Sequence, residues 1–265
     1  MLSVGQLLAF FLISLVASTI GAITGIGGGV MIKPAMDAFH VLSVDTISFL
    51  SGVTVLSMSC YNVVRSLRSG NGQLQIPIAL PLGIGAALGG VAGKQMFNHL
   101  LRLAGDANLV GAIQSACLIA ITALTLVYTC LSNSIRTRRV RNGTGICLIG
   151  VLLGVLSAFL GIGGGPLNLV VLSYFFSMKI KEAAQNSLMV IMLSQIASLI
   201  TTVLSASVPE FPPVLLVLLV CGGILGGILG RIANRRLDVR RIDALYRLTM
   251  VVIILISAYN LFAYL

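Results

Sequence analysis

Two glycine-rich motifs of identical sequence are the residues of this chain best suited to hold a ligand. Gly25-Ile26-Gly27-Gly28-Gly29 returns 136 positions later as Gly161-Ile162-Gly163-Gly164-Gly165. Unwound backbone inside a membrane survives only where protein or a water-filled cavity satisfies its polar groups. A helix that begins after such glycines offers free N–H groups and the positive end of its dipole to an anion. The motifs therefore predict an anion site between two helix N-termini. The site residues would be Gly25, Gly27, Gly28, Gly29, Gly161, Gly163, Gly164 and Gly165. The alternative is that these glycines only allow helices to cross closely.

A few polar side chains are further candidates for lining the site. Lys33 is the only cation near a motif, and it either supplies the charge of the site or extends to the lipid headgroups. Hydroxyl and amide groups hydrogen-bond oxyanions, although in membranes they also hold helices together. On this basis we expect Ser51, Thr54, Asn186, Ser187 and Gln195 to contact the substrate.

No catalytic or metal-binding arrangement accompanies these residues. The five cysteines show no CxxC spacing, and the two histidines, His40 and His99, lie 59 positions apart. A Walker A motif is absent from the sequence, so ATP hydrolysis is not expected. We therefore expect neither an enzyme nor a cofactor or metal, which leaves movement of a solute.

The segments that must position the candidates are membrane spans. The chain of 265 residues is 57% hydrophobic and 9% charged, far below the roughly 25% charged residues of soluble domains. Eight stretches of at least 18 residues lack Asp, Glu, Lys and Arg, and predict eight membrane segments. They are 2–32, 46–64, 69–93, 107–135, 142–178, 183–209, 211–230 and 248–265. The two that contain the glycine motifs are the longest, at 31 and 37 residues, so each must be interrupted.

A second pair of motifs indicates an internal duplication. Gly89-Gly90-Val91-Ala92-Gly93-Lys94 and Gly226-Gly227-Ile228-Leu229-Gly230-Arg231 lie 137 positions apart. Small residues at this spacing favour close helix packing, with the cation reaching the interface. We predict an all-α integral membrane protein of two four-segment repeats, 1–132 and 143–265, joined by a basic linker, 133–142. The first segment of each repeat is broken at its GIGGG motif. Valine at Gly28 or Gly164 should abolish binding, whereas valine at Gly90 should lower stability.

Charge predicts the partners and the orientation. The net charge of +10 is explained by cations that flank membrane segments, and needs no nucleic acid. If all eight segments cross the bilayer, six loop cations lie on one side and eleven on the other, which places both termini outside the cytoplasm. The cluster Arg136–Arg141 argues against this orientation. None of the seven acidic residues lies within a charge-free stretch, so any coupling would use protons carried with the substrate or an exchanged anion.

At these residues the chain resembles the TauE/SafE family of sulfite and organosulfonate exporters. The resemblance rests on Gly25–Gly29 with Pro34, on Gly161–Gly165, and on Ala183-Ala184-Gln185-Asn186-Ser187, which is similar to an A-x-x-T-S signature with Asn186 in place of threonine. Ser51-Gly52-Val53-Thr54 is a looser match, and Pro166 follows the second motif directly instead of several residues later.

The resemblance implies a secondary transporter that exports a small anion, sulfite or an organosulfonate, by alternating access in a bacterial inner (plasma) membrane. An anion channel of the same symmetry and a membrane assembly subunit without transport of its own stay open as alternatives. The sequence also leaves open whether the chain forms a homo-oligomer.

Overall fold

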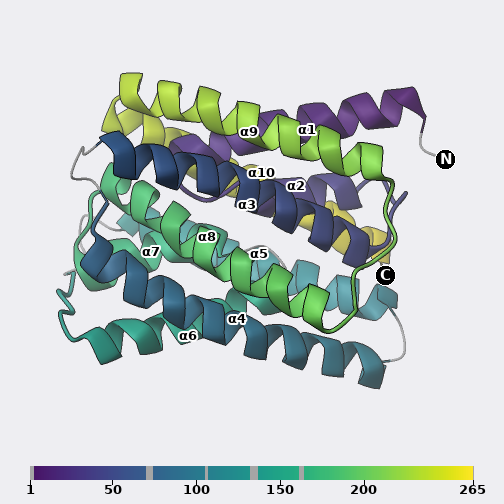
Figure 1. The fold of residues 1–265 in the computed structure, drawn as a ribbon, viewed down its shortest axis with the longest axis horizontal. Coiled ribbons are helices and arrows are strands. Elements are labelled where there is room, and N and C mark those ends of the chain that lie inside the picture. The colour runs from purple at the N-terminus through teal and green to yellow at the C-terminus, as the bar shows by residue number, and fades with distance from the viewer. Residues whose placement is uncertain (1–2, 70–73, 105–106, 132–136, 161–163, 265) are drawn as a thin grey trace.

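The computed structural model describes residues 3–69, 74–104, 107–131, 137–160 and 164–264, which form ten α-helices and no β-strand (Figure 1). The helices are α1 (Val4–Thr24), α2 (Gly29–Asp37), α3 (Val44–Ser69), α4 (Ile76–Ala104), α5 (Ala107–Leu131), α6 (Gly143–Leu160), α7 (Gly165–Phe176), α8 (Ile180–Leu204), α9 (Pro213–Arg236) and α10 (Val239–Tyr264). Seven of these are long and apolar enough to cross a membrane, and α6 and α7 are shorter apolar helices. The all-helical prediction is confirmed. The sequence predicts eight membrane segments, whereas the described residues contain seven helices that are long and apolar enough to cross a membrane.

The helices expose many large apolar side chains and bury several polar ones. On α1, Leu8, Leu12 and Val16 are each about half exposed, whereas Ser14 and Ser18 are fully buried. A protein dissolved in water has the opposite arrangement, because burial of apolar surface drives its folding. The outer surface of this molecule therefore suits contact with lipid.

The first glycine motif separates two helices that run in opposite directions. α1 begins at a capping box between Ser3 and Gln6, and ends where Gly25 takes a left-handed φ of 80°. A Cβ on Gly25 would lie 2.2 Å from Cα of Ala184, so only glycine fits against α8 here. α2 then returns along α1 until the ring of Phe39 meets that of Phe10, with 5.3 Å between the ring centroids. α1 and α2 thus form a helical hairpin.

α6 and α7 form a second helical hairpin. The N–H groups of Arg138 and Val140 donate to the carbonyls of Tyr174 and Phe175, at 2.7 and 2.9 Å. These bonds join the segment just before α6 to the end of α7, so the chain leaves the pair where it entered. Of the second motif, 161–163 lie outside the described residues, and Gly164 caps the N-terminus of α7.

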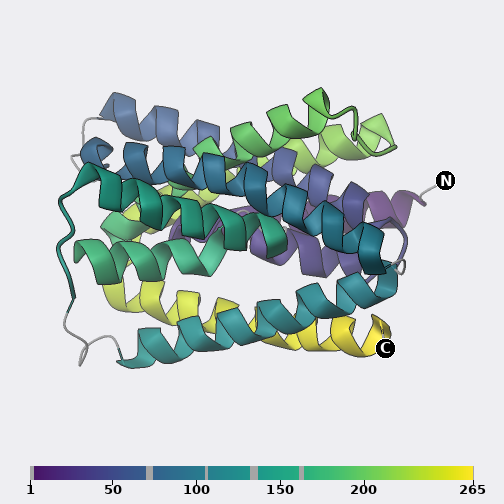
Figure 2. The same cartoon turned by 90° about the horizontal axis from the view of Figure 1, so that it is seen from below.

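The other six helices run the length of the molecule (Figures 1 and 2). Both chain termini lie at one end, here called the terminal end, where the α1–α2 hairpin also opens. The α6–α7 hairpin opens at the opposite end, here called the cationic end. From the helix bounds, thirteen of the sixteen described lysines and arginines lie at or near this cationic end. They are Arg65, Arg68, Arg138, Arg139, Arg141, Lys179, Lys181, Arg231, Arg235, Arg236, Arg240, Arg241 and Arg247.

The tips of the two hairpins meet between these ends. A Cβ on Gly165 would lie 2.1 Å from Cγ2 of Val30, so the start of α7 touches the start of α2. Val30 and Ile26 are almost completely buried and belong to one core cluster together with Leu169 and Leu172. The two hairpins therefore divide the interior into a part that faces the terminal end and a part that faces the cationic end.

Two seams of glycines hold pairs of helices in close contact. On α4, Cβ atoms at Gly85, Gly89 and Gly93 would lie 2.1, 2.0 and 2.5 Å from carbonyl oxygens of α6. On α9, Gly222, Gly226 and Gly230 face carbonyl oxygens of α1 in the same way. The predicted packing role of these motifs is confirmed for the seam positions. Gly90 is different, because no atom lies within 4 Å of a Cβ built on it, and the expectation that valine there would separate two helices is wrong.

Candidate functional site

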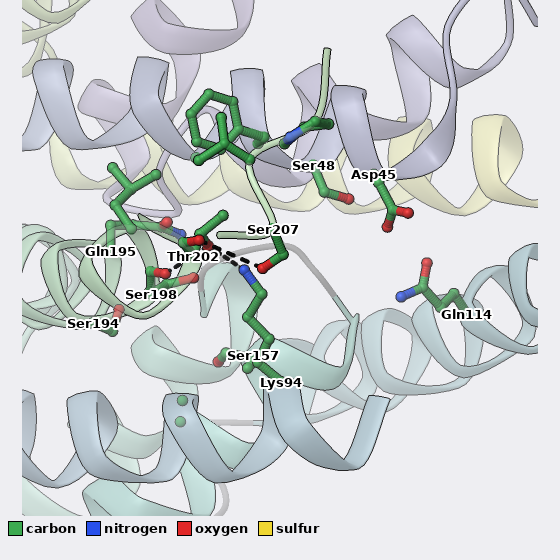
Figure 3. Close-up of a pocket in the computed structure, with 18 residues that line it drawn as sticks. Asp45, Ser48, Lys94, Gln114, Ser157, Ser194, Gln195, Ser198, Thr202 and Ser207 are labelled. Carbon is green, nitrogen blue, oxygen red and sulfur yellow. Dashed lines mark hydrogen bonds between the residues drawn. The ribbon is translucent and has the colours of Figure 1, made fainter. Parts of the chain in front are cut away.

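A cavity of about 370 Å³ lies between α3, α4, α5, α6 and α8 (Figure 3). It extends toward the terminal end, where Ser207, Val208 and Pro209 of the loop between α8 and α9 form part of its wall. The volume exists partly because Gly90 has no side chain to fill it, since no atom lies within 4 Å of a Cβ built there. Its polar lining consists of Asp45, Ser48, Lys94, Gln114, Ser157, Ser194, Gln195, Ser198, Thr202 and Ser207.

Lys94 supplies the only positive charge among the described lining residues, and Asp45 the only carboxylate. The Lys94 ammonium donates a hydrogen bond to Oγ1 of Thr202 on α8 (Figure 3). Thr202 in turn donates to the carbonyl of Ser198 at 2.8 Å. The sequence-based expectation that Lys94 extends to the lipid interface is therefore wrong, because its ammonium is directed into the cavity.

Gln114 is held in a fixed orientation at the wall of the cavity. Its Oε1 accepts a hydrogen bond from Nζ of Lys33 at 2.9 Å, and its Nε2 donates to the carbonyl of Phe159 at 2.9 Å. These two bonds connect the cavity wall to α2 of the first hairpin and to the end of α6 in the second. Gln114 is 6% exposed, so its amide is fixed by protein contacts and not by solvent.

Lys33, predicted as a site residue, is buried and does not line the large cavity. It borders a separate cavity of about 20 Å³, together with Asp37, Ser257 and Asn260. Because its side chain is only 6% exposed, the alternative in which it extends to the headgroups is excluded. Its contact with the large cavity runs through Gln114.

The described glycines of the two motifs lie outside the large cavity. Gly25, Gly27, Gly28 and Gly29 are buried among α1, α2 and α8, and a Cβ on Gly28 would lie 3.0 Å from Oγ of Ser18. Gly164 and Gly165 lie at the start of α7, while Gly161 and Gly163 fall outside the described residues. None of the described ones lines the large cavity, and their contact with a substrate stays a prediction.

Of the five predicted hydroxyl and amide residues, Gln195 lines the cavity. Ser51 and Ser187 are buried, and Thr54 donates to the carbonyl of Leu50 at 2.8 Å. Asn186 accepts a hydrogen bond from the backbone N–H of Gln75 at 2.8 Å, which joins α8 to the start of α4. Among the described residues, these four therefore lie in helix contacts outside the cavity.

Polar bonds connect the same helices at the cationic end. Arg231 on α9 donates to the carbonyl of Asn62 at 2.9 Å and to Oγ of Ser69 at 3.2 Å, both on α3. Ser66 of α3 donates to Gln185 of α8 at 3.1 Å. These bonds close α3, α8 and α9 against one another on the side away from the cavity.

Sequence reasoning missed Lys94, Asp45 and Gln114 as cavity residues. Gln114 could have been predicted to face the interior, because an amide within a charge-free stretch is costly to place in lipid. Lys94 and Asp45 lie at the edges of such stretches, where a charged residue usually marks the membrane surface. In the ranges that the structure covers, no group of three or more His, Cys, Asp or Glu could hold a metal ion.

The arrangement suits an oxyanion. A lysine ammonium offers three N–H donors, while the surrounding amides and hydroxyls offer more without adding charge. The family model described as sulfite exporter TauE/SafE matches residues 10–260 of the chain. No curated protein and no solved structure shows significant similarity to it.

Proposed function

We propose that this chain, which belongs to the sulfite exporter TauE/SafE family, is a secondary transporter that exports a small oxyanion, sulfite or an organosulfonate. The observation that carries the proposal is the cavity around Lys94, whose described lining has one cation, one carboxylate and several hydroxyls and amides within a shell of apolar helices. An ionisable side chain inside a membrane protein is costly and is therefore an indication of function. Lys94 would pair with the anion, and the side-chain NH2 groups of Gln114 and Gln195 would donate further hydrogen bonds to its oxygens.

Alternating access is supported by the similarity of the two halves. Gly85, Gly89 and Gly93 face carbonyls of Cys147, Val151 and Val155, and Gly222, Gly226 and Gly230 face those of Phe11, Leu15 and Thr19. The glycine triplets are 137 positions apart and their partners 136. Because the two hairpins open at opposite ends, we infer an inverted repeat, in which 1–132 and 143–265 run in opposite directions across the membrane.

The two halves differ in whether equivalent positions of α4 and α9 are open or covered, and the proposed mechanism would use this difference. Gly90 faces the open cavity, while Gly227, its counterpart, is covered by Met58 and Asn62, with 3.0 Å between a built Cβ and each nearest atom. Likewise Lys94 reaches into the cavity, whereas its counterpart Arg231 is bonded to α3. In an inverted repeat, the first half can adopt the covered arrangement of Gly227 and Arg231 while the second half adopts the open arrangement of Gly90 and Lys94. This exchange would close the cavity at the terminal end and open an equivalent one at the cationic end. The hairpin tips, where the predicted glycine contacts lie, would stand between the two positions.

The charge distribution supports one orientation in a bacterial plasma membrane. Thirteen described cations lie at the cationic end, and Lys33, Lys94 and Arg102 lie nearer the terminal end, which supports a cytoplasmic cationic end under the positive-inside rule. Cysteine introduced after Met1 or before Leu265, in a chain without its native cysteines, should react with a membrane-impermeant maleimide added to intact spheroplasts. Cysteine at Arg138 should react only after the membrane is broken. The reverse pattern would contradict the proposed orientation.

Counterflow in proteoliposomes tests the proposed function. Vesicles loaded with unlabelled sulfite should accumulate labelled sulfite against its gradient, and taurine or another sulfonate in the vesicles should support the same exchange. A carrier gives saturable counterflow, whereas a channel only equalises concentrations, so the result separates the proposal from an anion channel. Absence of movement of sulfite, sulfonates, sulfate, thiosulfate and carboxylates by a monodisperse preparation would favour an assembly subunit.

A further inference from the structure

A second cavity, of about 410 Å³, lies at the cationic end between α5, α7 and α10. It is separate from the cavity around Lys94, with which it shares no lining residue. Hydroxyls of Thr129, Thr137, Ser173 and Ser177 line it, and Ser177 donates to Thr137 at 2.7 Å. None of these residues takes part in the proposed transport site.

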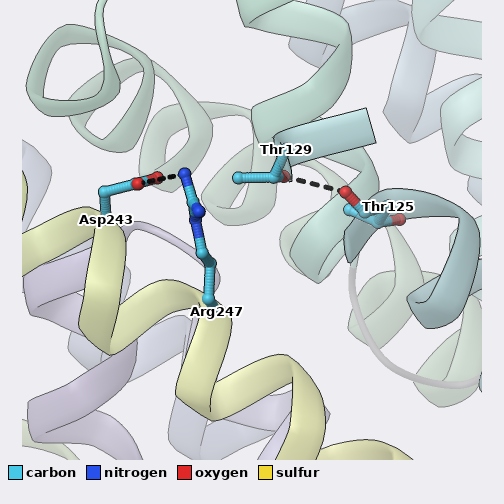
Figure 4. A network of polar contacts seen from close by, with 4 residues as sticks. All are labelled: Thr125, Thr129, Asp243 and Arg247. Atoms are coloured by element: carbon cyan, nitrogen blue, oxygen red, sulfur yellow. Dashed lines mark hydrogen bonds and ion pairs between the residues drawn. The ribbon is translucent and has the colours of Figure 1, made fainter. Parts of the chain in front are cut away.

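The second cavity is positively charged. Lys179, Arg240 and Arg247 line it, against the single carboxylate of Asp243 among its described lining residues. Nη2 of Arg247 pairs with Oδ2 of Asp243 at 2.6 Å (Figure 4). This pair neutralises one cation, and two more positive charges face the same space.

Arg247 keeps donors available to the cavity. Its Nη2 pairs with Asp243, and its side chain lines the cavity and is 41% exposed, so its outer N–H groups are open to a ligand there. Arginine donors bind phosphate oxygens with directed, charge-assisted bonds.

Apolar side chains stand beside these charges. Leu169 and Val170 of α7 and Ile180 of α8 line the same cavity, near the end of the membrane-spanning helices. Basic pockets between membrane helices at such a position bind anionic headgroups. We propose that this cavity binds a phosphate group, carried either by an anionic phospholipid of the adjacent leaflet or by a soluble phosphate ester. The inference does not depend on the identity of the transported anion.

Native mass spectrometry of the delipidated chain tests the assignment with defined probes. Phosphatidylglycerol should bind and phosphatidylcholine should not, because only the first carries a net negative charge. Arg247→Gln and Arg240→Gln should each weaken phosphatidylglycerol binding about tenfold, the loss expected for one charge-assisted hydrogen bond. Arg241→Gln is the matched control, since Arg241 is exposed at the same end and does not line the cavity.

Glycerol 3-phosphate distinguishes the two sources of the phosphate. Binding of phosphatidylglycerol alone identifies a lipid site, and binding of both identifies a site for the phosphate ester itself. The assignment is overturned if Arg240→Gln and Arg247→Gln bind phosphatidylglycerol as tightly as Arg241→Gln does, or if phosphatidylcholine binds equally well. Because only the first cavity contains Lys94, a Lys94→Met variant should retain wild-type phosphatidylglycerol binding, which keeps this test separate from that of transport.

Discussion

Replacing Lys94 by methionine is expected to lower sulfite counterflow in proteoliposomes about a hundredfold, since two lost charge-assisted hydrogen bonds at 1.4 kcal/mol each amount to that factor. Lys94 is the one cation among the described residues of the cavity, so no neighbour can replace its charge. Methionine keeps most of the length and apolar volume of the lysine stem. The loss should therefore reflect the missing ammonium and not a change in packing.

Two further substitutions make the Lys94 test specific. Lys94→Arg keeps the charge and should retain part of the transport, with a changed preference among sulfite, taurine and sulfate because the guanidinium is planar. Lys181→Met removes a cation at the cationic end, outside both large cavities, and should transport at the wild-type rate. Near-normal counterflow by a monodisperse Lys94→Met preparation would remove the cavity from the mechanism.

Apolar patterning was sufficient to predict the class of fold but not the path of the chain. The charge-free stretch 142–178 is too long for one span, and the glycines of the second motif lie within it. In the structure it contains α6 and α7, of 18 and 12 residues, which enter and leave at the same end. Composition cannot distinguish a broken span from a re-entrant hairpin, because both consist of apolar helix, glycine and apolar helix.

The helical hairpins also explain why loop charges gave an ambiguous orientation. Counting α6–α7 as one crossing places Arg138, Arg139 and Arg141 on the opposite side from Lys179 and Lys181. In the structure the N–H of Arg138 bonds to the end of α7, and these cations share one end. The positive-inside rule was therefore applied to a chain path that differs from that of the structure, and the cation distribution becomes strongly asymmetric once the hairpin is known.

The candidate site was harder to predict because it depends on the rotation of each helix about its axis. Gly89 and Gly90 are adjacent, and successive residues on a helix point about 100° apart. The same rotation turns Gln195 into the cavity and leaves Asn186, on the same helix, bonded to the start of α4. Residue type made both amides equal candidates, and only the neighbouring helices distinguish them.

This rotation makes Gly89 and Gly90 a matched pair with opposite expected results. Gly89→Val should lower the melting temperature by roughly 10 °C, because overpacking costs about 3 kcal/mol and each kcal/mol shifts a chain of this size by a few degrees. The cause is direct, since a Cβ on Gly89 would lie 2.0 Å from the carbonyl oxygen of Val151 on α6. Separation of α4 from α6 is the only way to relieve that contact.

Gly90→Val should instead melt at the wild-type temperature and lose anion binding. No atom lies within 4 Å of a Cβ at Gly90, and valine is a better helix former than glycine, so the folded state tolerates the change. Gly90 lies one helical turn before Lys94, on the same face of α4, and both line the cavity. Two methyl groups there occupy the space beside the ammonium and should weaken sulfite binding at least about tenfold, a difference of 1.4 kcal/mol. Calorimetric titration of both purified variants decides the question, with Gly90→Ala as the smaller step. Wild-type affinity in Gly90→Val would show that the anion binds elsewhere, and a lowered melting temperature would show that Gly90, too, is a packing position.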